Sequence, residues 1–279
     1  MNLPASVHLS ADDHAYPIFE INHPTCTAKV ALHGAHVMSW KPADEDEVLY
    51  LSPDAVFRES KAIRGGIPVC WPWFSAHPAD LAQPSHGLVR GRFWDFIGAS
   101  EDTSGVTLRF GIHIGIWNAE LRVRAGEELE VALETKNNLE MPIVVSGALH
   151  TYLGVSDISH VRVVGLDGCG YLDTVGTPKM LKQKGDVYFD TEVDRIYDSS
   201  SRILLVDDLS GRTILIEKSG SPTTVVWNPW SEKATAFADL PDDGFHKFCC
   251  IEAAIANDMA EIVMPGGSHV LMTRISVEE

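Results

Sequence analysis

Short runs of β-branched and aromatic residues, separated by turn residues, dominate this sequence. Gly, Asp, Ser and Pro stand between the runs in clusters such as "LDGCG", "DDLSG" and "LPDDG", and little of the chain has the apolar spacing of a helix. Closely spaced strands without intervening long helices favour antiparallel pairing over βαβ units. We therefore predict an all-β fold, a large antiparallel β-sandwich with few short helices. The clearest runs are "AKVALHG", "HVMSW", "GVTLRFGI", "ELEVALETKN", "IVVSGALHTYL", "TTVVWN", "FCCIEAA" and "HVLMTRISV".

The whole chain, residues 1–279, is expected to form a single domain, because no stretch has a linker's composition and no repeat of fixed period is visible. Apolar residues make up 45% of the chain and charged residues 22%, which is ordinary for a globular protein. No apolar run reaches the ~18 residues that a membrane helix needs. The chain also lacks a basic start followed by an apolar stretch, so we predict a cytoplasmic protein with no membrane partner.

Cysteine usage and net charge exclude several classes of function. The five cysteines are an odd number, and Cys249 and Cys250 are adjacent, where a mutual bridge would be strained, so reduced thiols are expected. No CxxC pair supports a zinc-thiolate site. The formal charge is −17 without a basic run, which argues against nucleic-acid binding. An anionic small substrate would therefore need a local basic pocket.

Two ionisable residues stand in apolar strand-like segments. In "SGALHTYLGVSDI", strand alternation places Ser146, Ala148 and His150 on one face, so small residues lead up to an imidazole and leave space beside it. In "CCIEAA", Glu252 sits where an ionised carboxylate is costly unless it is paired or hydrogen-bonded. A satisfied core histidine and a structural salt bridge are the alternatives to an acid/base couple.

The segment Pro53 to Ser85 is the least strand-like part of the chain, and long loops in compact folds are usually functional. Arg64 lies within this segment, in "IRGG", and Arg90 follows it in "HGLVRGRFW"; both stand beside glycines that would let backbone approach a ligand. Guanidinium groups suit bidentate phosphate contacts. Tryptophans near strand ends could stack on a sugar ring, although core packing is the more common role for each of them; they are Trp40, Trp71, Trp73, Trp94, Trp227 and Trp230.

Together these segments resemble the hexose-6-phosphate mutarotases, or glucose-6-phosphate 1-epimerases, of the aldose 1-epimerase (galactose-mutarotase-like) superfamily. The resemblance spans most of the chain. It implies a large antiparallel β-sandwich, no metal or organic cofactor, and interconversion of the α and β anomers of hexose 6-phosphates as small-molecule substrates. The matching segments are "HGAHVMSW", "IRGGIPVCWPWF", "HGLVR", "ALHTYLGVSDI", "DTEVDRIY", "VVWNPW" and "CCIEAA", in that order.

The resemblance also implies roles for individual residues. His150 and Glu252 fall on the family's catalytic histidine and glutamate, and Asp194 in "EVDRIY" falls on its sugar-contacting aspartate. Arg64 and Arg90 fall on its substrate-binding arginines. Before "HGLVR" the family often has a longer amide, whereas this chain has Ser85, whose side chain reaches less far; the neighbouring His86 is the alternative ligand contact.

Acid/base chemistry fits this assignment, because anomerisation requires two proton transfers as the sugar ring opens and closes. We expect Glu252 to act as the base toward the C1 hydroxyl and His150 as the acid toward the ring oxygen. From ordinary pKa values of about 4.3 and 6.5, both are predicted to be ionised near neutrality. Proximity of the carboxylate is predicted to raise the pKa of the imidazole further.

Other classes remain open from sequence alone. A metal-dependent cupin would also be a β-sandwich with several histidines, but "HGAH" spaces His33 and His36 by three, which on a strand points them to opposite faces. A non-catalytic sugar-phosphate-binding sandwich and a free-aldose mutarotase are the other readings. The sequence does not specify the preferred hexose phosphate, the physiological pathway or the oligomeric state.

Overall fold

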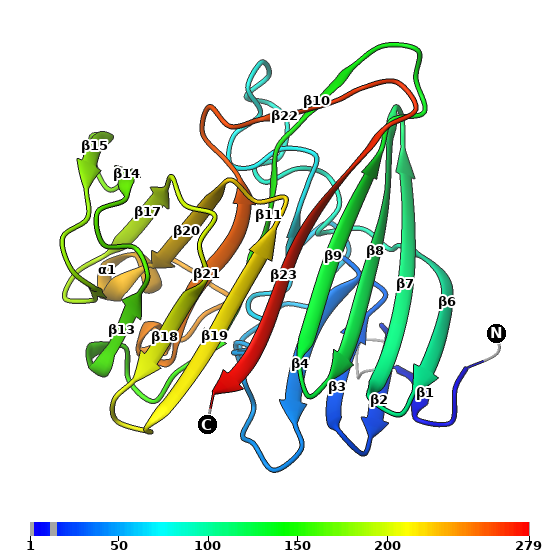
Figure 1. Ribbon diagram of the computed structural model, residues 1–279, viewed down its shortest axis with the longest axis horizontal. Helices are drawn as coiled ribbons and strands as arrows, with labels where there is room; N and C mark the ends of the chain where they lie inside the picture. Colours follow the sequence, from blue (N-terminus) through cyan, green and yellow to red (C-terminus); the bar gives the residue numbers. More distant parts are fainter. Residues whose placement is uncertain (1–2, 12–15, 279) are drawn as a thin grey trace.

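A nine-stranded antiparallel sheet forms one layer of the molecule in the computed structural model, which describes residues 3–11 and 16–278 (Figure 1). The strand order is β16-β13-β18-β19-β23-β9-β8-β7-β6. Strands such as β18 alternate buried and partly exposed residues because one face of the sheet meets the core. The strands are β6 (Asp95–Asp102), β7 (Gly105–Ile114), β8 (Trp117–Gly126), β9 (Leu129–Lys136), β13 (Val161–Val164), β16 (Val187–Tyr188), β18 (Ile203–Asp207), β19 (Arg212–Ser219) and β23 (Ser268–Glu278).

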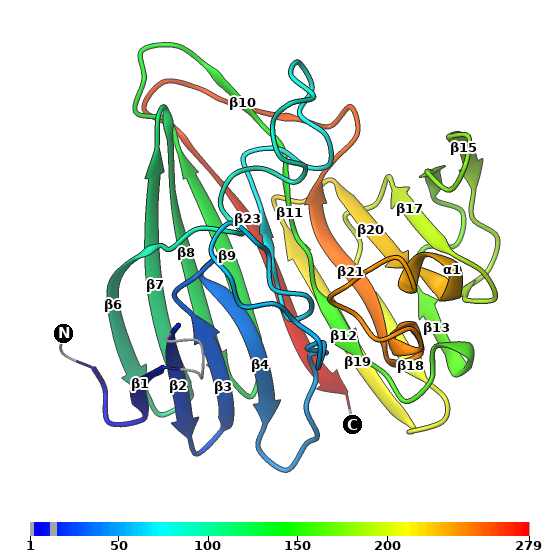
Figure 2. The same cartoon turned by 180° about the vertical axis from the view of Figure 1, so that it is seen from behind.

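Two further antiparallel sheets lie side by side behind this layer (Figure 2). A four-stranded sheet in sequential order packs on β7 and β8, and an eight-stranded sheet packs on β19 and β23. The first contains β1 (Val7–Ala11), β2 (Pro17–His23), β3 (Cys26–Ala31) and β4 (His36–Pro42). The second has the order β15-β14-β17-β20-β21-β11-β5, with β12 also paired to β21. Its strands are β5 (Val69–Cys70), β11 (Gly147–Leu149), β12 (Tyr152–Gly154), β14 (Gly170–Asp173), β15 (Lys179–Lys182), β17 (Val193–Tyr197), β20 (Thr223–Asn228) and β21 (Phe248–Ile255).

One continuous hydrophobic core fills the space between the layers. It joins Trp40 of β4 and Phe248 of β21 to Phe110, Leu121 and Ile275 of the nine-stranded sheet. Burying each such large side chain contributes about 1.5–3 kcal/mol. The arrangement confirms the predicted all-β sandwich, and all five cysteines are unbridged, as their spacing predicted.

The segment "IVVSGALHTYL", predicted as one strand, is divided in three. Its first part, β10 (Ile143–Val145), pairs with β22 (Glu261–Val263) in a separate two-stranded arm, whereas β11 and β12 pair with β21. The first division falls at Ser146, whose N–H donates to the carbonyl of Pro72 and whose Oγ accepts from the N–H of Phe74 at 3.0 Å. Side-chain bonding to the neighbouring loop therefore replaces ladder bonding at this point.

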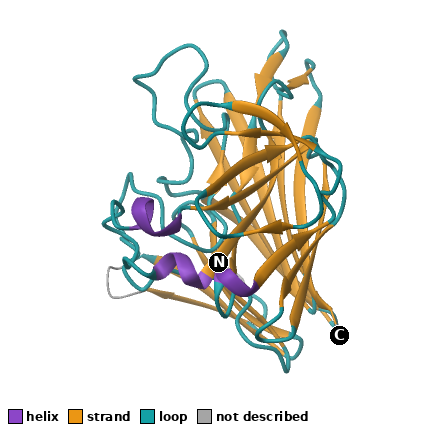
Figure 3. Ribbon diagram, turned by 90° about the vertical axis from the view of Figure 1, so that its left-hand side faces the viewer, coloured by secondary structure: helices purple, strands orange, loops and turns teal. Residues whose placement is uncertain are grey.

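Most loops gather on the side of the molecule away from the nine-stranded sheet (Figure 3). The predicted loop 53–85 contains only one named strand, β5, and runs across this side. The helices are short: η1 (Ile158–His160), α1 (Trp230–Ala234) and η2 (Gly244–Lys247). Within residues 3–11 and 16–278, no helix has both the length and the apolar character needed to cross a membrane.

Candidate active site

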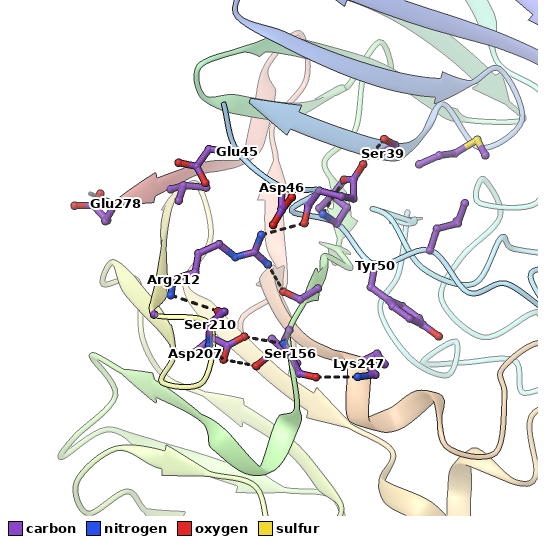
Figure 4. Close-up of a pocket in the computed structure, with 18 of the residues that line it drawn as sticks. Ser39, Glu45, Asp46, Tyr50, Ser156, Asp207, Ser210, Arg212, Lys247 and Glu278 are labelled. Atoms are coloured by element: carbon purple, nitrogen blue, oxygen red, sulfur yellow. Dashed lines mark hydrogen bonds between the residues drawn. The ribbon is translucent and has the colours of Figure 1, made fainter. Parts of the chain in front are cut away.

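Two cavities compete as the functional site, and their chemistry separates them. The larger, of about 970 Å³, lies between β4, β12 and the start of β19 (Figure 4). Its cationic groups Arg212 and Lys247 are engaged with the protein itself: Arg212 donates to the carbonyls of Glu47 and Gly154, and Lys247 donates to the carbonyl of Ser156. Asp207 accepts hydrogen bonds from the backbone and hydroxyl of the same Ser156. These hydrogen bonds connect the nine-stranded sheet to neighbouring segments, and the residues that make them form no acid/base couple.

The smaller cavity, of about 380 Å³, contains the predicted catalytic residues. Strands of the eight-stranded sheet form one side of it, and the loops that precede β6 and follow α1 form the other. A volume of this size matches a small-molecule site. Its lining comprises Lys61, Ala62, Ile63, Arg64, Pro68, Phe74, His86, Arg90, His150, Tyr152, Asp194, Val225, Trp227, Lys233, Phe237, Asp239 and Glu252.

Strand register places His150 directly opposite Glu252. Leu149 pairs with Ala253 and Tyr152 with Cys250, so the residues between them face each other across the same ladder. The imidazole Nε2 lies 3.4 Å from Oε1 of the carboxyl group. The glutamate side chain is 1% exposed and its Oε2 has no protein hydrogen-bond partner among the described residues. One oxygen of the couple is therefore available to a ligand.

Burial decides the protonation of this couple. Desolvation lowers the pKa of His150 well below its ordinary range, and the neighbouring His86, Arg90 and Arg64 lower it further. Desolvation raises the pKa of Glu252 well above its ordinary range, and Asp194 adds to the effect. The prediction of a raised imidazole pKa is therefore wrong, because loss of water outweighs the attraction of one carboxyl group. Burial thus shifts both groups toward their neutral forms.

Aromatic rings fix the orientation of the imidazole. The ring of Tyr152 stacks on His150 with centroids 4.8 Å apart and an interplanar angle of 11°, and Trp227 meets it edge-on at 5.6 Å. The space beside His150 is lined by Pro68 and Phe74, whereas Ser146 and Ala148, predicted to provide it, lie outside the cavity. Ala148 is fully buried and pairs with Cys70. Of the tryptophans proposed as stacking platforms, Trp227 alone lines this cavity.

Arg64 is held by three neighbours. Its Nε and Nη2 both lie 3.1 Å from Oδ1 of Asp239, and its Nη1 donates to the hydroxyl of Tyr152 at 3.1 Å. The guanidinium also lies over the ring of Phe237, 4.3 Å from its centroid. The predicted binding residue therefore lines the cavity as part of a network that includes the tyrosine stacked on His150.

The segment "SHGLVR" contributes Arg90 and His86 but not Ser85. Ser85 is exposed and lies in a neighbouring cleft, where its carbonyl accepts from Nη2 of Arg90 at 3.1 Å. Its predicted ligand contact is not supported by this placement, since the short side chain does not line the cavity. His86 does line it, 6.2 Å from the ring of His150. Burial, Arg90 and Arg64 lower the pKa of His86 to about 4.

Asp194 lies on β17 across from Trp227 and faces the same cavity. Lys233 of α1 holds its Oδ2 at 3.8 Å and Oε1 of Glu192 at 2.7 Å. Burial raises the pKa of Asp194, while Lys233 opposes that shift. The aspartate is thus an acceptor on the wall of the cavity formed by β17, next to Lys233 of α1.

Sequence reasoning did not find Lys61, Lys233, Phe237 and Asp239. They lie in loops or in α1, where no strand period or apolar context distinguishes a functional charge from a solvated one. Tyr152 had a usable signal, because it follows the histidine by two residues and strand alternation places both on one face. The histidines of the cupin alternative, His33 and His36, are both fully buried. Among residues 3–11 and 16–278, no three His, Cys, Asp or Glu side chains are grouped to hold a metal ion.

The glycines beside the arginines serve chain packing, not the predicted approach to a ligand. Gly66 has φ +59°, and a Cβ there would overlap the carbonyl oxygen of Val37 and lie 2.7 Å from Nε2 of His36. Gly87 has φ +81° and faces the carbonyl oxygen of Trp71 in the same way. The loops that carry Arg64 and Arg90 are therefore held against neighbouring backbone.

We expect Gly66→Ala to lower the free energy of unfolding by more than Gly115→Ala, which serves as the matched control. Gly115 has φ +60° but nothing within 4 Å of an added Cβ, so its change reports backbone strain alone, about 1–2 kcal/mol. The overlap at Gly66 adds to that cost. Urea unfolding of both variants measures the difference. Equal losses of unfolding free energy would show that the close backbone contact at Gly66 does not contribute to stability.

Comparison with known proteins agrees with the fold. The aldose 1-epimerase family profile matches residues 17–276. A "putative glucose-6-phosphate 1-epimerase" of Escherichia coli K12 is 34% identical over 261 residues, 90% of this chain and 87% of its own length. A protein of the same name from Cenchrus ciliaris is 36% identical over 252 residues, 82% of this chain and 75% of its own length.

The crystal structure of a "putative mutarotase" from Salmonella typhimurium superposes with a TM-score of 0.92 at 30% identity, covering 100% of this chain and 95% of that one. The profile match, the sequence relatives and this superposition each span most of the chain. The chain belongs to the aldose 1-epimerase family.

Proposed function

We propose that this protein interconverts the α and β anomers of glucose 6-phosphate and related hexose 6-phosphates by opening and closing the sugar ring. The observation that carries the proposal is the His150–Glu252 couple, 3.4 Å apart and buried at the floor of a cavity that also presents arginine side chains. Family membership and the names of the relatives support it. An acid and a base that share one proton suit a reversible reaction without a net redox change.

Ring opening uses the couple in its charge-separated form. Moving the shared proton from Glu252 to His150 gives a carboxylate and an imidazolium without changing the net charge of the pair. The carboxylate then takes the proton of the C1 hydroxyl, the C1–O5 bond breaks, and the imidazolium protonates O5. The product is the open-chain aldehyde with a free 5-hydroxyl, and the couple again holds one proton, now on the glutamate.

Ring closure reverses these transfers after C1 has turned about the C1–C2 bond. His150 takes the proton of the 5-hydroxyl, O5 attacks the other face of the carbonyl carbon, and Glu252 returns its proton to O1. The remaining lining residues bind the sugar: Asp194 accepts from ring hydroxyls, and the arginines and His86 donate to the substrate. The stacked Tyr152 keeps the imidazole in place throughout.

Two-dimensional exchange NMR tests this function directly. Cross-peaks between the anomeric protons of glucose 6-phosphate should grow faster with enzyme than in buffer, in proportion to enzyme concentration. A panel of hexose 6-phosphates and their free sugars identifies the substrate class. Binding without accelerated exchange on any of them would instead support the non-catalytic sugar-phosphate-binding alternative.

The pH dependence of the rate should be a broad bell. On the acid side, activity falls when the couple gains a second proton, and the lowered pKa of His150 puts this limb well below pH 6.5. On the alkaline side, activity falls when the couple loses its only proton, and the raised pKa of Glu252 puts this limb well above pH 4.5. These limbs belong to the pair as a whole. Saturating exchange rates across pH measure them, and an acid-side decline centred at the ordinary histidine pKa would contradict the assignment.

A further inference from the structure

The turn "HGAH" between β3 and β4 has several locally unfavourable features. Gly34 and Ala35 both have left-handed backbone, with φ +75° and +45°, and the alanine is fully buried; this conformation is unfavourable for a residue with a Cβ. His33 and His36 are also fully buried, and none of their ring nitrogens has a hydrogen-bond partner within the described part of the chain. Buried polar groups in that state lower stability. Such features gather where a local structure serves function.

One side of the turn is bonded to the loop of Arg90. The N–H of Gly34 donates to the carbonyl of Arg92 at 2.6 Å, and His33 forms a β-bridge with Phe93. A Cβ on Gly34 would lie 3.0 Å from the carbonyl oxygen of Arg90 itself. The turn therefore lies directly against the backbone that carries this arginine.

The other side of the turn meets the loop of Arg64. Val37, the residue after the turn, forms a β-bridge with Ile67 and accepts from its N–H at 2.8 Å. The imidazole of His36 packs on Gly66, where an added Cβ would lie 2.7 Å from Nε2. One short turn thus borders both loops whose arginines line the cavity.

Each imidazole of the turn also faces the residue that directly follows one of these arginines. Burial lowers the pKa of both rings, that of His36 to about 3. The backbone of Gly65 beside His36 and that of Gly91 beside His33 oppose this shift. These contacts fall short of hydrogen-bond geometry. Both rings are therefore neutral near pH 7 and act through shape and a weak polar contact, not through charge.

We infer that the "HGAH" turn positions the two substrate-binding arginines, with His36 fixing the loop of Arg64 and His33 fixing the loop of Arg90. Neither histidine lines the cavity, so both are positioning residues and not catalytic ones. The inference rests on the proposed function, in which both arginines contact the substrate. It gives a role to a buried histidine pair that the acid/base mechanism does not use.

His36→Leu and His33→Leu test this assignment, because leucine fills a similar volume without ring nitrogens. The free energy of unfolding should stay the same or rise, since unpaired buried nitrogens are removed. We expect KM for glucose 6-phosphate to rise about tenfold as one arginine loop loosens. The value of kcat should stay within about threefold of wild type, because the His150–Glu252 couple is unchanged. His36→Gln, whose amide can reach the place of Nε2, should restore KM in part.

His23→Leu is the matched control. His23 is buried in the same four-stranded sheet, but its ring hydrogen-bonds to Thr25 and to the carbonyl of Asp102 instead of facing an arginine loop. This variant should lower the free energy of unfolding and leave KM unchanged, the reverse of the pattern expected for His36→Leu. Loss of folded protein in His36→Leu, or a fall in activity that matches a fall in stability, would make the role of the turn structural.

Arginine side-chain NMR tests the inference apart from activity. The Nε–H signal of Arg64 should shift in His36→Leu and that of Arg90 in His33→Leu, while the signal of the other arginine stays in place. Movement of both signals or of neither in either variant would overturn the assignment, and so would a wild-type KM in both folded variants. Absence of anomer exchange in the wild-type protein would remove the proposed function and leave these shifts unaffected.

Discussion

Replacing Glu252 with Gln should reduce the enzyme-catalysed exchange of glucose 6-phosphate anomers by about 10²- to 10⁴-fold, the range typical of removing a general acid or base. The amide cannot accept the C1 proton and return it. Its shape matches the protonated carboxyl group that burial favours at this position. The fold should therefore tolerate the change, with a loss of unfolding free energy of about 1 kcal/mol or less.

Measuring both activity and stability of Glu252→Gln distinguishes a catalytic role of the glutamate from a structural one. Exchange NMR gives the rate after subtraction of the spontaneous reaction, and urea unfolding gives the stability of the same preparation. Glu217→Gln is the control, because Glu217 lies on the opposite layer and its side chain is 47% exposed. Near-normal exchange in Glu252→Gln would remove the glutamate from the mechanism. A loss of activity matched by loss of folded protein would make its role structural.

The two catalytic candidates were visible in the sequence because of their setting. An ionisable group inside "CCIEAA" or "GALHTYL" conflicts with the surrounding apolar strand, and such conflicts mark functional positions. Strand alternation likewise predicts which neighbours share a face. The pairing of His150 with Glu252 was a hypothesis, since nothing local specifies that β12 and β21, about a hundred residues apart, lie in register.

The rest of the site depends on tertiary structure. Asp239 and Phe237 contact Arg64 from a loop that follows α1. Asp239, the ion-pair partner, is 175 residues from Arg64 in the sequence. The predicted strand through Ser146 breaks because its hydroxyl bonds the backbone of Phe74, 72 residues away. The predicted direction of the His150 pKa shift was wrong because it, too, depends on tertiary structure. Sequence shows the attracting carboxyl group but not the depth of burial, and burial is the larger effect.

Loss of the imidazole should be as costly as loss of the carboxyl group, for a different reason. In His150→Asn no side-chain acid faces O5, so the C1–O5 bond must break with poorly stabilised charge on the ring oxygen. We expect exchange of glucose 6-phosphate anomers to fall by about 10²- to 10⁴-fold. His113→Asn is the control, because it makes the same change on the exposed face of β7. Exchange NMR of both variants measures the effect.

Packing complicates this variant more than the glutamate one, because His150 stacks on Tyr152 and meets Trp227 edge-on. A drop in activity could then arise from displaced neighbours. His150→Ala with added imidazole separates loss of the proton donor from displacement of its neighbours. A free imidazole that enters the vacated space can restore proton transfer, but it is not attached to the chain and does not restore the original packing. Two results would identify the His150 side chain as the proton donor. Exchange should recover in part and saturate as imidazole is added, and the acid limb of the recovered rate should follow the pKa of free imidazole instead of the lowered pKa of the native ring. Absence of recovery, together with wild-type exchange in a correctly folded His150→Asn, would assign the acid to another residue of the cavity. The other imidazole that lines it, His86, whose ring centroid lies 6.2 Å from that of His150, would be tested first.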